Sequence, residues 1–332
     1  MRIKSIFMAI AIIIISFSSL FSQEPGKYGF VEIGRTKVSL TIADVKDPQN
    51  KVFDDKTVQF FQFNADVSAS LSKTPAELTE DDITNIAEAL SNVKGTCAKT
   101  GVKKIFTFLS SSYADIEKGK RQQYLSDIKI ESGFDALYYN TKKEALAVAG
   151  TALISYADQG LAILIGSSTT RGGLLIPDGK GGYFIETLVV MEGITKLKDE
   201  MIDANPLDDE TYLTGRHVSI INNFEKIVTT NPNFKTRKVL VLCGDAPSIL
   251  AKVLGKTEIT LSDLNSLRKR IKNPEFQATL TANAIDAKTL LVSIHFIEAI
   301  MEEFPLSKTI IDPNERSFAF GAGLDLLASG GL

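Results

Sequence analysis

The sequence predicts an α/β protein of two similar lobes that face a central cleft, with helical additions in the C-terminal half. Apolar runs of strand length alternate with amphipathic runs of helical length, which is typical of α/β architectures. One unit also occurs twice: a strand that ends in Ile-Gly, a turn of Ser, Thr and basic residues, and a second strand. The copies are centred on Ile33-Gly34 and Ile165-Gly166. An internal repeat of this kind indicates duplicated lobes, which we place at 23–150 and 151–332.

The predicted elements of the N-terminal half begin with a hairpin. Residues 28–45, YGFVEIGRTKVSLTIADV, predict two strands around a turn at Gly34, Arg35 and Thr36. Thr79 lies three residues before Asp82, which is the spacing of a helix-capping box. The remaining elements are a strand at 56–64, a helix after the capping box, a strand at 102–108, a basic helix ending near Gly133, a short strand at 136–139, and a helix that begins at Asn140 or Thr141 and ends near Tyr156.

The C-terminal half opens in the same way. LAILIG at 161–166 predicts a strand, SSTTRGG at 167–173 a turn, and LLIP at 174–177 another strand. Asp245 is expected to cap a helix that has Pro247 in its first turn. The other predicted elements are a hairpin turn at 178–182, strands at 183–190 and 237–244, helices at about 191–204 and 210–229, a mostly helical stretch at 260–303, and a final helix at 317–328.

Composition and charge exclude several classes of protein. Hydrophobic residues make up 44% and charged residues 23%, which excludes wholesale disorder. The net charge of -3 argues against nucleic acid as a partner, because proteins that bind it usually carry a basic excess. Neither the cysteines, Cys97 and Cys243, nor the histidines, His217 and His295, have metal-ligand spacing. We expect structural histidines and two separate buried thiols, with a disulfide as the alternative.

The N-terminus predicts a secretory signal peptide at residues 1–22. Arg2 and Lys4 precede the apolar run IFMAIAIIIISFSSLF, and Ser22 is a small residue after which cleavage is expected. The run is short for a membrane span, which needs roughly 20 residues. We therefore expect a protein exported to the periplasm or cell envelope, with no stable membrane span once the leader is removed. An uncleaved anchor and a homodimer both stay open.

The two Ile-Gly turns have the composition of a phosphate cradle. Glycine lets backbone N–H groups approach a phosphate closely, and hydroxyl and basic side chains add donors. A third turn, at Gly244, precedes a helix N-terminus, where backbone donors are free. The candidate phosphate-binding residues are Gly34, Arg35, Thr36, Lys37, Gly166, Ser167, Ser168, Thr169, Thr170, Arg171 and Gly244. If the turns face one cleft, they could bind one anionic ligand.

The order of these motifs resembles the exopolyphosphatase and guanosine pentaphosphate phosphohydrolase (Ppx/GppA) family of the actin-like ATPase superfamily. FVEIGRTKVSLTIADV resembles its opening Asp-Ile-Gly-Ser-Asn-Ser motif, and LAILIGSSTT its second, Asp-Ile-Gly-Gly-Gly-Ser-Thr-Glu. VLVLCGDAPSILAKVL resembles the later Gly-Gly-Thr segment, and GFDALYYNTKKEALAVAG the stretch that ends in Glu-Glu-Ala. The likeness spans nearly all of residues 28–328. It implies that the lobes are actin-like (RNase H-like) and that the ligand is a phosphorylated anion.

The resemblance also implies two catalytic residues. Glu144 falls on the family's catalytic base, and Glu32 falls on the first-motif Asp and keeps a carboxylate that could hold a metal or a water. From the residues alone, other roles stay open. Glu144 is then a helix first-turn Glu favoured by the dipole, Glu32 an ordinary strand-end residue, and Arg171 and Lys37 solvated charges.

Other positions depart from the family's pattern. Leu164 stands where the family has a metal-binding Asp, and Arg171 where it has a Glu. Of the family's Thr-Ser-Ala-Leu-Arg-Glu-Ala stretch only Ser110 survives, with Tyr113 at the Arg. Loss of a carboxylate removes a ligand for Mg²⁺, while Arg binds phosphate well. We therefore expect a cleft that attracts polyanions and holds Mg²⁺ poorly.

Three functions follow as hypotheses. The first is an exported, divergent exopolyphosphatase-like phosphoanhydride phosphohydrolase with a degenerate metal site, in which Glu144 is the base and Glu32 a metal or water ligand. Its substrate would be inorganic polyphosphate or a related phosphate ester. The second is a catalytically inactive pseudoenzyme of the cell envelope that binds a polyanion or a partner protein. The third is a structural envelope protein with an inherited fold. The departures from the motifs weigh against catalysis.

Overall fold

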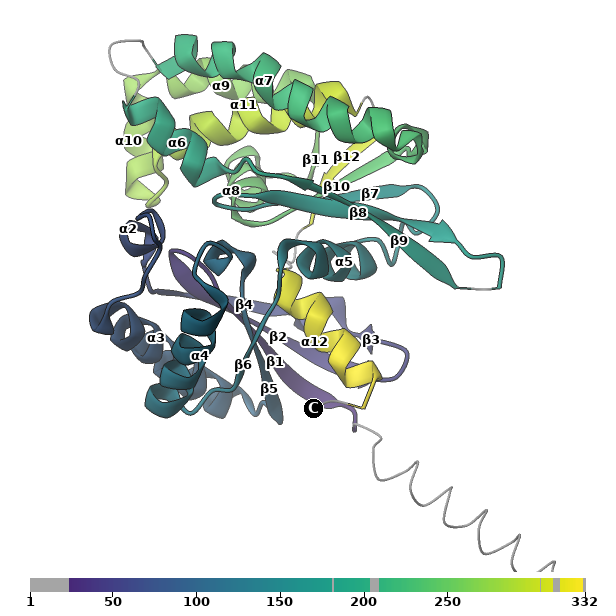
Figure 1. Cartoon of the computed structure of the whole chain (residues 1–332). Coiled ribbons are helices and arrows are strands. Elements are labelled where there is room, and N and C mark those ends of the chain that lie inside the picture. Colours follow the sequence, from purple (N-terminus) through teal and green to yellow (C-terminus); the bar gives the residue numbers. More distant parts are fainter. Residues whose placement is uncertain (1–23, 181, 204–208, 305, 313–316, 331–332) are drawn as a thin grey trace, which may run out of the picture.

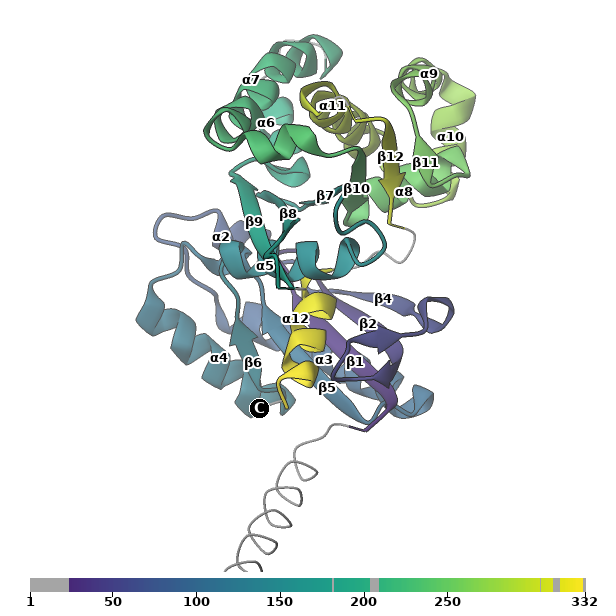
Figure 2. The same ribbon diagram turned by 90° about the vertical axis from the view of Figure 1, so that its right-hand side faces the viewer.

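Two six-stranded sheets, one in each half of the chain, form the framework of this computed structural model, which describes residues 24–180, 182–203, 209–304, 306–312 and 317–330 (Figures 1 and 2). The predicted signal peptide at 1–22 lies outside the described residues. Within them, no helix combines the length and the apolar character that a membrane span requires.

The first sheet has the strand order β3-β2-β1-β5-β6, with β4 paired to β2. β1 pairs antiparallel with β2 and parallel with β5, so the predicted hairpin around Gly34 is confirmed and lies at the centre of the sheet. The strands are β1 (Gly26–Ile33), β2 (Lys37–Asp47), β3 (Val52–Phe53), β4 (Gln59–Asn64), β5 (Lys104–Leu109) and β6 (Ala136–Tyr138). Short helical turns connect them: η1 (Asp55–Thr57), α2 (Ser68–Leu71) and η2 (Ser111–Tyr113).

Two helices, α3 (Glu80–Thr100) and α4 (Lys118–Ser132), cover the outer face of this sheet (Figure 1). The predicted capping box is confirmed, because the Asp82 N–H donates to Thr79 Oγ1 at 3.2 Å and the Thr79 N–H donates to the Asp82 carboxylate at 2.8 Å. The buried apolar residues of α3 recur at helical spacing: Ile83, Ile86, Leu90 and Val93. The helical period in the sequence therefore marks the face that packs on the sheet.

The second sheet has the order β11-β12-β10-β7-β8-β9. β7 and β8 form the second hairpin, and β10 runs parallel to both β7 and β12. The strands are β7 (Gly160–Ile165), β8 (Thr170–Pro177), β9 (Tyr183–Val190), β10 (Val239–Cys243), β11 (Glu258–Ile259) and β12 (Lys308–Ile311). The sequence predicts β7 to β10, but not β3, β11 or β12, each of which has four residues or fewer.

Helices cover the outer face of the second sheet (Figure 1). α11 lies at the centre of this layer, where it contacts α6, α7, α8 and α9. The helical stretch predicted at 260–303 is confirmed as three helices, α9 to α11. The elements of the layer are α6 (Ile194–Asp203), α7 (Asp209–Thr230), η3 (Pro232–Thr236), α8 (Asp245–Leu254), α9 (Leu261–Ile271), α10 (Pro274–Ala282) and α11 (Ala287–Glu303).

Two crossing helices join the lobes. α5 (Thr141–Ala152) packs on β7, β8 and β9, whereas α12 (Phe318–Ala328) returns from the second lobe and packs on β1 and β5. The two helices contact each other between the sheets (Figure 2). Glycines make this close packing possible, since a Cβ at Gly321 would lie 2.2 Å from the Ala147 carbonyl oxygen. The boundary that we placed after residue 150 falls near the end of α5.

Three local predictions are wrong. SSTTRGG is a turn only in its first part, because β8 begins at Thr170. Its glycines serve close packing instead, since a Cβ at Gly172 would lie 1.9 Å from the Ala162 carbonyl oxygen. α5 ends at Ala152 rather than near Tyr156. Asp245 is the first residue of α8, not its cap, because Gly244 takes the cap position with a φ of 105°.

Candidate anion-binding cleft

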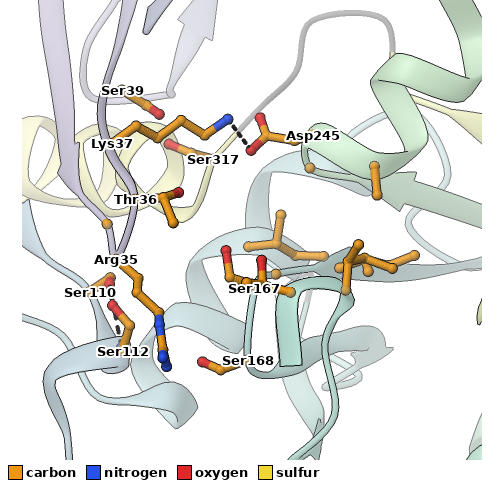
Figure 3. A pocket seen from close by; sticks show the side chains of 18 of the residues that line it. Arg35, Thr36, Lys37, Ser39, Ser110, Ser112, Ser167, Ser168, Asp245 and Ser317 are labelled. Atoms are coloured by element: carbon orange, nitrogen blue, oxygen red, sulfur yellow. Dashed lines mark hydrogen bonds and ion pairs between the residues drawn. The ribbon is translucent and has the colours of Figure 1, made fainter. Parts of the chain in front are cut away.

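Two equivalent turns face one cavity between the lobes. The Gly34 N–H donates to the Lys37 carbonyl at 3.0 Å, and the Gly166 N–H donates to the Thr169 carbonyl at 3.1 Å. Each bond closes a two-residue loop, Arg35-Thr36 in one lobe and Ser167-Ser168 in the other. Both loops line a cavity of about 250 Å³ (Figure 3). The repeat in the sequence is thus a repeat in space, and both copies contribute to one site.

The glycines of the turns are required by close contacts. A Cβ at Gly166 would lie 2.7 Å from the Thr169 carbonyl oxygen, and one at Gly244 would lie 2.6 Å from the Ile165 carbonyl oxygen. Gly244 places the N-terminus of α8 at the cavity, and the first N–H groups of a helix have no partner within it. The cavity thus has backbone donors of the kind that anions bind.

Charged side chains reach the cavity from both lobes. Lys37 Nζ lies 2.5 Å from Asp245 Oδ2, across the cleft (Figure 3). Arg35 donates to the Ser68 carbonyl at 3.2 Å and to the Ser72 hydroxyl, and among the described residues no carboxylate pairs with it. The acceptors that position the Arg35 guanidinium are therefore uncharged, so its positive charge is not neutralised and can attract an anionic ligand.

Glu32 lines the same cavity from the end of β1. Burial raises the pKa of its carboxyl from the usual 4.5 to about 7. The Glu144 and Asp245 carboxylates add to this rise, while Arg171 opposes it. A group with a pKa near neutrality can accept or donate a proton at physiological pH.

Glu144 does not line the cavity but lies behind it, fully buried. Its Oε1 accepts the Ser111 N–H at 2.6 Å, and its Oε2 accepts the Ser111 hydroxyl at 2.6 Å. Arg171 Nε lies 2.7 Å from Oε2, and an Arg171 Nη donates to Thr169 Oγ1 at 2.6 Å. The two charges, which come from α5 and β8, thus form a buried ion pair with hydrogen-bonded ends.

The residues of the cleft do not fit a Mg²⁺ site. Mg²⁺ is usually held by one or two carboxylates with waters and substrate phosphates. Two carboxylates line the cavity, and one of them, Asp245, is paired with Lys37, while the Leu164 side chain beside them offers no ligand atom. Across the described chain, no three His, Cys, Asp or Glu side chains gather into a set that could hold a metal ion.

The structure brings most of the predicted phosphate-binding residues to the cavity. Nine of the eleven candidates line it: Gly34, Arg35, Thr36, Lys37, Gly166, Ser167, Ser168, Arg171 and Gly244. Glu32, which was predicted as a catalytic residue or a metal or water ligand, lines it as well. Thr169 and Thr170 do not, because they belong to the closing end of the turn and to β8. Thr170 is buried and its hydroxyl donates to the Glu192 carbonyl at 2.8 Å.

Several cavity residues were not predicted: Ser39, Ser112, Thr195, Thr289 and Ser317. A signal exists for Ser39, which follows Lys37 by two residues and therefore lies on the same face of β2. None exists for Thr289 and Ser317, which are brought in by helices far along the chain. The expectation of separate buried thiols is confirmed, since Cys97 and Cys243 are both buried and no disulfide joins them.

No protein-family model and no curated protein matches the chain. Solved structures do. The Ppx/GppA enzyme from Aquifex aeolicus matches with a TM-score of 0.67 and 15% identity over 90% of this chain and 99% of that one. An exopolyphosphatase from Cytophaga hutchinsonii matches with a TM-score of 0.67 and 18% identity over 92% and 100%. An exopolyphosphatase-like protein matches with a TM-score of 0.70 and 13% identity over 91% and 98%. The predicted two-lobed, actin-like α/β fold of the Ppx/GppA structures is thus confirmed.

Proposed function

We propose that the cleft binds inorganic polyphosphate or a related phosphorylated anion and does not hydrolyse it with Glu144 as the base. The fold supports the class of ligand, because two of the similar structures are named as an exopolyphosphatase and an exopolyphosphatase-like protein. The lining of the cavity supports it independently. Glycine turns, hydroxyls, a helix N-terminus and the Arg35 guanidinium are all groups that bind phosphate.

The state of Glu144 is the observation that argues most strongly against hydrolysis by this route. A general base must lie within hydrogen-bond reach of the water that it activates. Glu144 is fully buried, and its two oxygens are engaged by Ser111 and Arg171. Arg171 holds Glu144 as a structural partner, and a buried charge pair of this kind is costly to separate.

Binding and phosphate release would be measured together on the full-length chain in mild detergent. Labelled polyphosphate should bind with an affinity that falls as salt rises, since charge attraction is screened. Arg35→Ala should weaken binding roughly tenfold. Lys94→Ala, which removes an exposed cation of α3 far from the cavity, is the matched control and should have no effect. The proposal fails if the wild-type chain does not bind polyphosphate at low salt.

A second candidate function is slow hydrolysis with Glu32 as the base. It is favoured by one observation: Glu32 lines the cavity and has a pKa of about 7. In that case phosphate release should rise with pH through about 7, as the carboxyl loses its proton. Glu32→Gln should abolish the release, whereas Glu88→Gln, which makes the same change at an exposed position of α3 outside the cavity, should leave the release unchanged.

We also propose that the chain works outside the cytoplasm. The charged start and apolar run at residues 1–22 support export. Cell fractionation with an antibody to the C-terminal lobe would test this proposal, and an intact N-terminus on the protein in the cytoplasmic fraction would contradict it.

A further inference from the structure

We propose that Asp245 is a built-in competitor for the anion. Its carboxylate neutralises Lys37 and clasps the two lobes together until a polyanion displaces it. This inference rests on the proposed function of the cleft as an anion site. Asp245 would thereby lower the affinity of the protein for its ligand. It would also couple ligand binding to separation of the two lobes.

The geometry of Asp245 is that of a clasp. Asp245 begins α8 in the second lobe, and both its oxygens are engaged by the first lobe. Lys37 Nζ, from β2, lies 2.5 Å from Oδ2, and the Gln62 side-chain amide, from β4, donates to Oδ1 at 2.6 Å. Gly244 occupies the cap position of the helix, so the Asp245 side chain is not needed there and is free to reach across the cleft.

The place of this carboxylate is also the place of an anionic ligand. Asp245 lies at a helix N-terminus and lines the same cavity as Lys37 and Thr36. Figure 3 shows its carboxylate directed toward the Lys37 ammonium. Helix N-termini and lysines both attract negative charge. A phosphate that bound Lys37 would therefore have to separate it from Asp245, whose negative charge would also repel it.

The exposure of the pair shows that such an exchange is feasible. The side chains of Lys37 and Asp245 are 28% and 43% exposed, whereas those of Arg171 and Glu144 are 7% and 0% exposed. Ion pairs open to water are weak, because the solvent screens them and the side chains lose freedom. The two ion pairs therefore differ. The buried pair of Arg171 and Glu144 stays closed, whereas a ligand with several negative charges can replace Asp245 as the partner of Lys37.

The test compares Asp245→Asn with Asp325→Asn in the full-length chain. Asp325 forms an ion pair with Lys51 and is 53% exposed, so its substitution makes the same charge change in a similar pair outside the cavity. Asp245→Asn should bind polyphosphate roughly three- to tenfold more tightly than wild type, since it removes both the competitor and the repulsion. Asp325→Asn should bind like wild type. Equal or weaker binding by Asp245→Asn would overturn the proposal.

A second measurement reports on the clasp without any ligand. Spin labels on Lys94→Cys in α3 and Lys226→Cys in α7, both exposed, would give the distance between the lobes, because the native Cys97 and Cys243 are buried. The distribution of distances between the two labels should become broader and shift to longer distances in Asp245→Asn, but not in wild type or Asp325→Asn. If no variant binds polyphosphate, the proposed function fails, and this distance still decides whether Asp245 is a clasp. An unchanged distribution would overturn that part.

Discussion

Replacing Arg171 tests whether Glu144 is locked in a structural ion pair or held ready for chemistry. Arg171→Met removes the guanidinium and keeps a chain of similar length among apolar neighbours, including Phe318, whose ring centre lies 5.8 Å from Cζ of Arg171. Glu144 then keeps its two hydrogen bonds from Ser111 but loses its ion-pair partner at zero exposure. An uncompensated charge would be left in the middle of the molecule.

The expected cost follows from this burial. Removing one partner of a buried pair costs about 3–5 kcal/mol, because the other charge stays desolvated. We expect the lower end, about 3 kcal/mol, since both Ser111 bonds remain. The double variant Glu144→Leu/Arg171→Met should recover most of the loss, because apolar replacements of a whole pair are neutral or stabilising. Lys37→Met, which breaks the open pair with Asp245, should cost at most about 1 kcal/mol.

Urea unfolding followed by circular dichroism would measure these free energies, and this signal suits a chain that has no tryptophan. The reasoning would be refuted by a loss below about 1 kcal/mol in Arg171→Met, the value typical of exposed pairs. It would also be refuted if the double variant were less stable than the single one. The first result would mean that Glu144 can reach solvent or a ligand, and the case for hydrolysis would gain strength. The second would mean that the ion pair stabilises the fold more than apolar side chains do in its place.

Three further predictions concern pH, packing and thiol reactivity. Because the pKa of Glu32 is raised from 4.5 to about 7 in the folded chain, the folded chain retains a proton that the unfolded chain has released in this window. The contribution of Glu32 to the free energy of unfolding should therefore fall as pH rises from about 4.5 to about 7. Burial lowers the pKa of His295 to about 4, which acts in the opposite direction, but equally in wild type and in Glu32→Gln. The difference in free energy of unfolding between wild type and Glu32→Gln, measured with urea, should therefore fall over this pH range. Gly172→Ala should destabilise the chain by at least about 2 kcal/mol, since the new Cβ would meet backbone. Gly95→Ala in α3, where a Cβ meets nothing within 4 Å, should gain about 0.5–1 kcal/mol in the same assay. Burial raises the pKa of the Cys97 thiol to about 11, so a disulfide reagent at pH 8 should label the native chain at least tenfold more slowly than the urea-unfolded chain, and fast native labelling would contradict this.

Local signals in the sequence predicted the first part of the fold well. The capping box at Thr79 and the left-handed Gly133 mark helix ends that depend on nearby residues alone, and both are found where expected. The two glycine turns were predicted because each hairpin is also local. In contrast, β12 has four residues and gains its place from pairing with β10, which is nearly seventy positions earlier. Such a strand has no local signal.

Some features of the candidate site could likewise be predicted from the sequence, and others depend on the fold. The residues of the turns could be named from the sequence because the motif repeats, and ten predicted site residues line the cavity. The pairing of Glu144 with Arg171 could not be predicted from the sequence, since it depends on how α5 packs on the second sheet. Neither could the clasp at Asp245: an acidic residue at the start of a helix is usually a cap, and only the fold shows that a glycine has taken that role.

The return of α12 to the first lobe has a consequence for how the chain is made. The face of the first sheet that meets α12 includes Phe30 and Phe108, whose rings contact Phe320 and Phe318. This face stays uncovered until synthesis has passed residue 328. The N-terminal lobe therefore cannot mature on the ribosome as an independent unit, although proteins with several lobes commonly fold from the N-terminus onward. The last helix of the chain thus completes the packing of its first lobe.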